Sequence, residues 1–340
     1  MPAPLRIGVV GAGLIGGSII RAAVGAGAEV TACDRDAATV AALEEAGVRV
    51  VDGPAEVAAA SAVAFAAVPP QAAPKVCLAM LDADAEVLVT DTASVKESVC
   101  RAVAADAGPA QLARFVAGHP LAGRESRGWE NADPAILAGA VWALCPQPGA
   151  TDPAALLRVM EVVTGPIGAR VAVVDAHEHD VALACTSHMP HLAASALIGT
   201  VAASAPALRY RLSGGALRDG TRVAAASSEL WDEILRDNAG NIVVALDTLV
   251  AELGSLRDLV AEGRWERLLD RWQERAALRD DLQGARWGRE GTVGALGWGE
   301  DLGPLLAFGR RGGLVTAVHR TDSGGAVLDT KAVPAPTTPG

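Results

Sequence analysis

Short apolar runs alternate with stretches of helical periodicity through the first 145 residues of the chain. The runs are short and rich in Val and Ala, as in buried strands. We expect strands at residues 7–10, 30–33, 63–67, 87–90, 114–117 and 141–144. Helical patterns lie between them, around residues 14–26, 36–46, 71–81 and 95–106. Strand–helix alternation of this kind predicts an α/β fold with a doubly wound parallel sheet.

The pattern changes after a helix at 153–163 and a strand at 169–173. Residues 175–205 are apolar and rich in Ala, which predicts a long helix with a kink at Pro190. Helical patterns follow at about 226–260 and 262–283, and we assign Trp265 and Trp272 there to packing. We therefore predict an all-α second domain. Its apolar helices favour dimerisation, and a monomeric bundle core is the alternative.

Three domains follow from these patterns. Residues 1–172 form the α/β domain, residues 173–288 the helical domain, and residues 289–340 a Gly-rich C-terminal extension that is partly disordered. Within the extension, residues 314–320 and 326–329 predict a β-hairpin, whereas the final KAVPAPTTPG predicts disorder.

A glycine cluster follows the first strand directly. Gly11, Gly13 and Gly16 form G-x-G-x-x-G, a helical pattern begins at once, and Asp34 follows the next strand. This context is typical of a dinucleotide-binding turn, in which glycines permit a tight turn and close approach of the pyrophosphate to the helix N-terminus. Asp34 favours NAD over NADP because a carboxylate repels a 2′-phosphate, although the neighbouring Arg35 keeps NADP use open.

Ligands of such sheets bind beyond the carboxyl ends of the strands. Residues 68–70, 91–96 and 118–125 fall at those ends. The cofactor-binding residues that we predict are Gly11, Gly13, Leu14, Ile15, Gly16, Asp34, Arg35, Val68, Pro69 and Thr92.

Composition narrows the classes of partner. The net charge of −11 argues against general nucleic-acid binding, and it requires a local cluster of basic side chains for any anionic substrate. We find no apolar run near the roughly 18 residues of a membrane span and no signal pattern, so we predict no membrane association. Five cysteines without a C-x-x-C pair predict a cytoplasmic location.

Five short motifs carry most of the remaining polar chemistry. They are DTASVK (91–96), GHPLAG (118–123), HEHD (177–180), SHMPH (187–191) and GGALRDGTR (214–222). A neutral imidazole suits proton removal near pH 7, and a guanidinium group suits a carboxylate. The histidines and Asp180 leave a metal site as an alternative, but hydride transfer to NAD needs no metal, and we predict none.

In this order the motifs resemble those of the prephenate/arogenate dehydrogenases of tyrosine biosynthesis. GAGLIGGS, DTASVK, GHPLAG, HD with SHMPH, and RDGTR with ELW match that family over about residues 5–285. The resemblance implies a Rossmann-type domain, a helical dimerisation domain, NAD and a homodimer. It also implies an NAD-dependent prephenate dehydrogenase, which converts the cyclohexadienyl dicarboxylate prephenate into 4-hydroxyphenylpyruvate by oxidative decarboxylation.

The resemblance also implies individual roles. His119 would accept the proton of the 4-hydroxyl group, and Ser94 resembles the serine that orients this histidine. Arg222 resembles the arginine that binds the ring carboxylate. Further substrate-binding residues expected are His191, His179, Gly215, Trp231 and Lys96, the last as a source of positive field. A structural role for His188 stays open.

Four alternative functions have to be compared with this one. An arogenate dehydrogenase would need a carboxylate near the substrate's ammonium group, and Glu130 and Asp133 are candidates. A 4-amino-4-deoxyprephenate dehydrogenase is a further alternative. A β-hydroxyacid dehydrogenase would be expected to use a lysine in the helical domain, and no lysine lies between Lys96 and Lys331. An NAD(H)-sensing protein is the non-enzyme alternative, against which the retained His, Ser and Arg argue.

Overall fold

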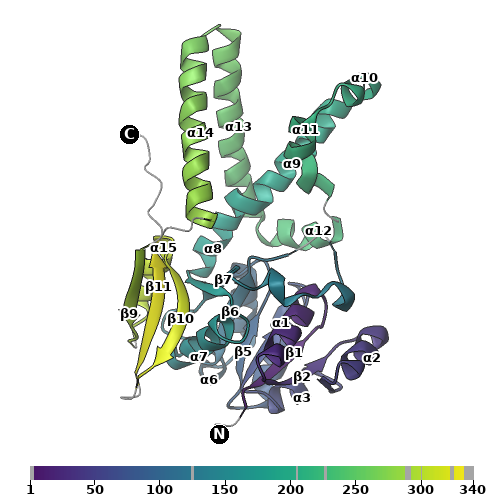
Figure 1. Ribbon diagram of the computed structural model, residues 1–340, viewed down its shortest axis with the longest axis vertical. Helices are drawn as coiled ribbons and strands as arrows, with labels where there is room; N and C mark the ends of the chain where they lie inside the picture. The colour runs from purple at the N-terminus through teal and green to yellow at the C-terminus, as the bar shows by residue number, and fades with distance from the viewer. Residues whose placement is uncertain are drawn as a thin grey trace. The chain divides into compact units, whose positions relative to one another are not determined.

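The computed structural model describes residues 4–123, 126–203, 206–225, 228–287, 292–299, 301–321 and 325–332. The chain divides into two compact units. The first contains Met1–Ala176 and Leu278–Gly340, and the second contains His177–Ala277. Figure 1 shows the sheet of the first unit and the long helices of the second.

The sheet of the first unit has the strand order β3-β2-β1-β4-β5-β6-β7-β8-β10-β11-β9. Its first eight strands are β1 (Arg6–Val10), β2 (Glu29–Cys33), β3 (Arg49–Val50), β4 (Val63–Ala66), β5 (Leu88–Asp91), β6 (Phe115–Pro120), β7 (Val141–Cys145) and β8 (Arg170–Val173). The six strands predicted before residue 145 are all present. The predicted doubly wound parallel sheet is confirmed, and among these eight strands one pair, β6 with β7, is antiparallel.

Helices cover both faces of this sheet. They are α1 (Leu14–Gly25), α2 (Ala37–Glu45), α3 (Pro54–Ala59), α4 (Ala73–Ala83), α5 (Glu97–Asp106), α6 (Pro109–Leu112) and α7 (Pro153–Thr164), with the 3-10 turns η1 (Trp129–Asn131) and η2 (Pro134–Ile136). Strand residues alternate between two apolar clusters. Val63 and Phe65 pack in the cluster that contains α1, whereas Ala64 and Ala66 pack in the cluster that contains α4.

The C-terminal extension continues the same sheet. Strands β9 (Thr292–Gly297), β10 (Leu314–Arg320) and β11 (Ala326–Ala332) pair antiparallel, and β10 joins β8 where Val315 pairs with Val171. The predicted hairpin is confirmed. Helix α15 (Gly303–Arg310) packs against β8. The approach is so close that a Cβ on Gly309 would lie 1.8 Å from the carbonyl oxygen of Val173. The predicted disorder at residues 333–340 lies outside the described residues.

The second unit is helical, as predicted. Its elements are α8 (Ala176–Leu183), the π-helical turn η3 (Ala184–His188), α9 (Met189–Ala202), α10 (Pro206–Arg211), α11 (Gly215–Thr221), η4 (Arg222–Ala225), α12 (Ser228–Asp237), α13 (Ala239–Ala261) and α14 (Trp265–Trp287). The kink predicted at Pro190 takes the form of the π-helical turn just before it. The helix predicted over 226–260 is interrupted at Asn238.

Helices α13 and α14 run side by side in Figure 1, and the Arg271 guanidinium donates to the Ser255 hydroxyl at 2.7 Å between them. Both helices expose apolar side chains. Trp265 and Trp272, which were assigned to packing, are 57% and 73% exposed and are therefore not packed within the single chain.

Two helical stretches, Ala176–Ala202 and Ala239–Ala261, are long and apolar enough to cross a membrane by length and composition alone. Our expectation that no stretch reaches this level is therefore wrong. The same test is passed by helices of soluble proteins that bury an apolar face. In this chain only 17% and 11% of the two apolar windows are buried.

Candidate active site

The glycine turn has the geometry that a dinucleotide requires. Gly11 has φ +88°, and a Cβ on Gly11 would lie 2.4 Å from the carbonyl oxygen of Ala67. A Cβ on Gly16 would lie 1.8 Å from the carbonyl oxygen of Gly11, so α1 and the turn meet where no side chain fits. A Cβ on Gly13 would meet no atom within 4 Å, which leaves its backbone open toward a ligand. These residues fit a pyrophosphate at the start of α1.

Asp34 closes this turn from the end of β2. Its Oδ2 accepts a hydrogen bond from the backbone N–H of Ala12 at 2.6 Å, and its Oδ1 accepts one from the N–H of Asp36 at 2.9 Å. The side chain is half-buried, whereas Arg35 is exposed. The carboxylate therefore lies at the glycine turn, where a ribose hydroxyl could donate to it. Recognition of the ribose stays a prediction.

The other predicted cofactor residues lie along the same edge of the sheet. A Cγ atom of Val68 lies 3.1 Å from the position of a Cβ on Gly11, and Pro69 follows it with an exposed ring. The N–H of Thr92 donates to the carbonyl oxygen of Ala66 at 3.2 Å, beyond the end of β5. Leu14 and Ile15 begin α1.

His119 lies near the carboxyl end of β6. It pairs with Ala143 of β7 and is half-buried. Ser94 is half-buried in the turn that joins β5 to α5. Both residues therefore belong to the carboxyl ends of adjacent strands, β5 and β6. The orienting contact between Ser94 and His119 stays a prediction.

Lys96 differs from the expected substrate contact, because its side chain is fully buried. Its ammonium group pairs with the carboxylate of Asp91 and donates to the carbonyl oxygen of Gly118 at 2.6 Å. Asp91, which the motif DTASVK contains, received no role in the sequence prediction. A signal was available, since an acid at the end of a buried strand needs a partner.

A second polar cluster lies inside the helical unit. His179 Nδ1 contacts Asp180 Oδ1 at 2.7 Å, and both residues are buried. The Asn238 amide donates to the Asp180 carbonyl oxygen at 2.8 Å and to His188 Nδ1 at 3.1 Å. Burial lowers the pKa of His188 to about 4, against an opposing effect of Asp180 and with smaller help from His179 and His191. His188 is therefore neutral at pH 7, with its proton on Nε2.

The ring of Trp231 lies close to both histidines of the SHMPH motif. Its centroid is 4.1 Å from that of His191 and 5.8 Å from that of His188, which meets it edge-on. His191 Nδ1 lies 2.8 Å from the carbonyl oxygen of Ser187, so Nδ1 carries the proton and donates. Nδ1 of His191 therefore donates a hydrogen bond, whereas Nδ1 of His188 accepts one. Sequence reasoning missed Asn238, which lies far from these residues in the sequence.

Arg222 and Gly215 belong to the same unit. Gly215 begins α11, Arg222 begins η4, and η4 packs against α9, the helix of His191. Both residues are exposed. The neighbouring Arg218 pairs with Asp219 at 3.3 Å, and both of these side chains are exposed. Binding of substrate by Arg222 and Gly215 stays a prediction.

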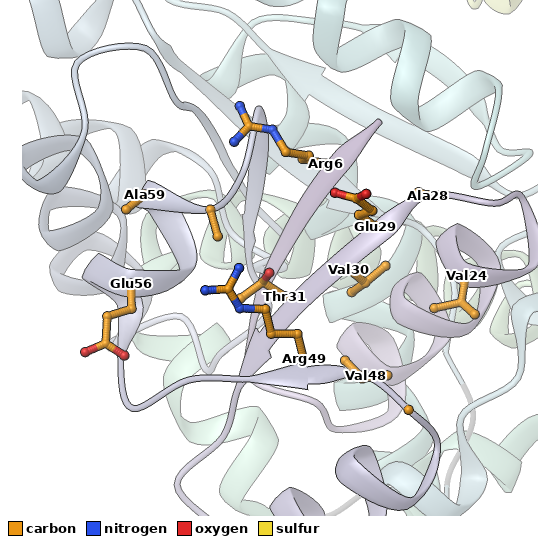
Figure 2. Close-up of a pocket in the computed structure, with 12 residues that line it drawn as sticks. Arg6, Val24, Ala28, Glu29, Val30, Thr31, Val48, Arg49, Glu56 and Ala59 are labelled. Atoms are coloured by element: carbon orange, nitrogen blue, oxygen red, sulfur yellow. The ribbon is translucent and has the colours of Figure 1, made fainter. Parts of the chain in front are cut away.

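A hollow of about 660 Å³ lies at the amino-terminal ends of β1 and β2, opposite the glycine turn. Figure 2 shows Arg6 and Glu29, which begin these strands, together with Arg49 and Glu56 around its rim. Its walls are therefore of mixed charge, and they lie away from the glycine turn at the strands' carboxyl ends. Within the described part of the chain, His, Cys, Asp and Glu form no group of three that could hold a metal.

Comparison with known proteins places this geometry in a family. Residues 18–173 match the nucleotide-binding domain of prephenate dehydrogenase, and residues 175–274 match the dimerisation domain. The cyclohexadienyl dehydrogenase of Zymomonas mobilis is 33% identical over 293 residues, which cover 81% of this chain and 97% of that protein.

Solved structures agree. The Synechocystis arogenate dehydrogenase has a TM-score of 0.73 and 26% identity, covering 82% of this chain and all of that one. The fold is shared with the Aquifex aeolicus prephenate dehydrogenase solved with hydroxyphenyl propionate and NAD⁺, at a TM-score of 0.74 and 24% identity, over 82% of this chain and 99% of that one. The chain belongs to the prephenate dehydrogenase family of oxidoreductases.

Proposed function

We propose that this protein is an NAD⁺-dependent prephenate dehydrogenase, which converts prephenate into 4-hydroxyphenylpyruvate and CO₂. The observation that carries the proposal is the half-buried His119 at the carboxyl end of β6, in the same sheet as the glycine turn and Asp34. NAD⁺, when bound, accepts the hydride that leaves C4 of the ring. The family membership and the NAD⁺-bound relative support this choice of cofactor.

The protein's own residues handle the proton. As hydride leaves C4, the 4-hydroxyl becomes acidic, and neutral His119 accepts its proton. The ring loses its carboxylate as CO₂, whose bonding electrons complete the aromatic ring, and the proton returns to the phenolate oxygen. Ser94 would hold the His119 ring in position.

Binding of the dianionic substrate needs local positive charge, since the chain carries a net charge of −11. Arg222 would bind the ring carboxylate through two parallel hydrogen bonds. His191, whose ring lies on Trp231, would contact the side chain of the substrate together with His179 and Gly215.

We favour prephenate over arogenate as the substrate because of the local contacts that two carboxylates make. An arogenate enzyme needs a carboxylate for the ammonium group, and the two candidates already serve the local fold. Asp133 caps η2 by accepting from the N–H of Ala135 at 2.9 Å, and Glu130 accepts from the Asn131 amide at 3.2 Å. Because the relatives are named for prephenate, arogenate and cyclohexadienyl substrates, arogenate is the second candidate.

We also infer that the protein is a cytoplasmic homodimer. Residues 175–274 match a dimerisation domain, and this segment exposes apolar side chains such as Val244, Val250, Leu269 and Trp272. A second copy would cover them, which also accounts for the two apolar helices without a membrane. The five cysteines are all free thiols, as expected in a reducing compartment.

The test is NADH formation by the purified protein, with prephenate and arogenate offered separately and with NAD⁺ and NADP⁺ each. Turnover of prephenate with NAD⁺ is expected. Turnover of arogenate alone would assign the second candidate. Failure with both substrates, while NAD⁺ still binds, would overturn the proposal and favour the amino-deoxy analogue or an NAD(H) sensor. Sedimentation of the same sample tests the dimer.

A further inference from the structure

A buried ion pair lies beside the strand that carries His119. Asp91 ends β5, Lys96 lies at the start of α5, and both side chains are fully buried. The pair does not face solvent, where ions bind weakly to one another and are readily exchanged. The two charges instead bind the backbone of the neighbouring strand β6.

Both charges bind the backbone of Gly118, the residue just before His119. The Lys96 ammonium donates to the carbonyl oxygen of Gly118 at 2.6 Å, and Asp91 Oδ1 accepts from its N–H at 3.0 Å. Asp91 Oδ2 also accepts from the N–H of Ala93 at 3.0 Å, which fixes the carboxylate. The two side chains thus satisfy both polar groups of one peptide residue in β6.

These contacts begin where the backbone ladder ends. Strands β5 and β6 pair in parallel at Val89 with Phe115 and at Thr90 with Val116. At Gly118, side chains from β5 and α5 replace the backbone partner that a longer β5 would have supplied. The hydrogen bonds of the ion pair therefore continue the attachment of β6 to its neighbours as far as Gly118, the residue before His119.

The strand has no free space at this point. A Cβ on Gly118 would lie 2.8 Å from both the Asp91 carbonyl oxygen and the Thr90 hydroxyl, and 2.9 Å from Trp142 Nε1. Gly118 is therefore enclosed on its side-chain face by three groups and held at its backbone by two more. A shift of β6 would break a charged hydrogen bond or close one of these contacts.

Burial of two charges is a poor way to stabilise a fold, because desolvation offsets much of their attraction and a packed apolar pair does as well. We propose that Asp91 and Lys96 are positioning residues, which fix the backbone at Gly118 and so hold His119 for proton transfer. The inference rests on the proposed function of His119. It assigns Lys96 a role different from the substrate contact that the sequence suggested.

The experiment compares Lys96→Met, Asp91→Asn and the apolar double variant Asp91→Leu/Lys96→Met. We expect each to lower kcat about 10–100-fold, because a displacement near 1 Å costs that much in reactions that depend on orientation. KM for prephenate and Kd for NAD⁺ should stay within about twofold. The double variant should lose no more activity than the singles while its Tm equals or exceeds that of the wild type.

An exposed lysine outside the ion pair provides the control. Lys75→Met, at an exposed lysine of α4, should leave kcat and KM unchanged. An increase in KM at unchanged kcat would show that Lys96 binds substrate, and a double variant with wild-type kcat would show that the pair only supports the fold. Either result overturns the proposal.

A readout without turnover separates this proposal from the proposed function. NMR of the His119 imidazole should give one sharp resonance in the wild type and broadened or multiple resonances in Lys96→Met, with no change in Lys75→Met. An unchanged His119 resonance in Lys96→Met overturns the positioning role. Inactive wild-type protein would instead overturn the proposed function, and the NMR comparison would still decide the role of the pair.

Discussion

The backbone N–H of Ala12, inside the glycine turn, donates to the carboxylate of Asp34 at 2.6 Å. This hydrogen bond joins the end of β2 to the start of α1. One oxygen of Asp34 serves the turn and the other binds the N–H of Asp36, so the carboxylate has a fixed position from which its remaining lone pairs can accept ribose hydroxyls.

Asp34→Ser should shift cofactor preference from NAD⁺ toward NADP⁺. The substitution removes the charge that repels a 2′-phosphate and leaves Arg35 beside it to attract one. We expect kcat/KM with NAD⁺ to fall and the ratio of NADP⁺ to NAD⁺ efficiency to rise about tenfold or more, because one charged hydrogen bond contributes roughly 1.5–3 kcal/mol. Steady-state kinetics with both cofactors measure it, and an unchanged ratio would mean that Asp34 does not contact the ribose.

His119→Asn should lower kcat by about 10²–10⁴-fold, the usual contribution of a positioned general base. Asn keeps a similar shape and one hydrogen-bonding end, so Kd for NAD⁺ should not change. His319→Asn is the matched control, since His319 is exposed on β10 and pairs only with Asp329 among the contacts described for it. Near-normal kcat in His119→Asn would remove this residue from the proton transfer.

Arg222→Ala should raise KM for prephenate by about 10–100-fold with a smaller effect on kcat, because it removes a charged contact to the ring carboxylate. Arg218→Ala is the comparison, since Arg218 lies four positions before Arg222, is exposed, and pairs with the adjacent Asp219. An equal effect of the two substitutions, or an unchanged KM in Arg222→Ala, would contradict the carboxylate contact.

The helical unit should lose stability as the pH falls from 6.5 to 4. His188 has a pKa of about 4 in the folded chain and an ordinary value near 6.5 when unfolded, so the unfolded state binds more protons in this range. The loss is complete near pH 4 and amounts to at most about 3 kcal/mol. Tm measured at pH 7 and pH 5 tests it.

Two variants isolate His188 in that experiment. His188→Gln should remove this part of the pH dependence. Asn238→Asp should reduce it as well, because a carboxylate facing Nδ1 favours the charged imidazole and raises its pKa. The same pH dependence in all three proteins would show that His188 is not its source.

Gly309→Ala should destabilise the first unit by several kcal/mol, since the new methyl would lie 1.8 Å from the Val173 carbonyl oxygen and α15 would have to move off β8. Gly25→Ala, also at a helical glycine but with nothing within 4 Å, should be neutral or slightly stabilising. Urea unfolding of both variants provides the comparison. Equal stability of the two would mean that α15 does not pack on β8 in solution.

Much of the first unit was predictable from local pattern, because parallel strands buried on both faces are continuous apolar runs. Strand β3 was missed because two residues carry no periodicity. The antiparallel step between β6 and β7 was missed because a run of apolar residues does not encode its direction. The joining of β10 to β8 depends on residues too far apart in the sequence for any local pattern.

The candidate site was also predictable only in part. The glycine turn and Asp34 were predictable because the ligand dictates the residue types and their spacing. The partners of Lys96 and His188 were not, because Gly118 and Asn238 bind them through contacts between distant segments. Lys96 was assigned from its motif and its charge, and neither reveals whether a side chain is buried.

The pairing of β8 with β10 also has a consequence in time. During synthesis, Val171 leaves the ribosome about 140 residues before its partner Val315. At a synthesis rate of roughly 5–20 residues per second, the outer edge of β8 remains unpaired for about 7–30 seconds. An open strand edge of this kind attracts other strands. The nascent chain thus exposes an unpaired strand edge while the helical unit is being made, and a chaperone that shields β8 would act in that interval.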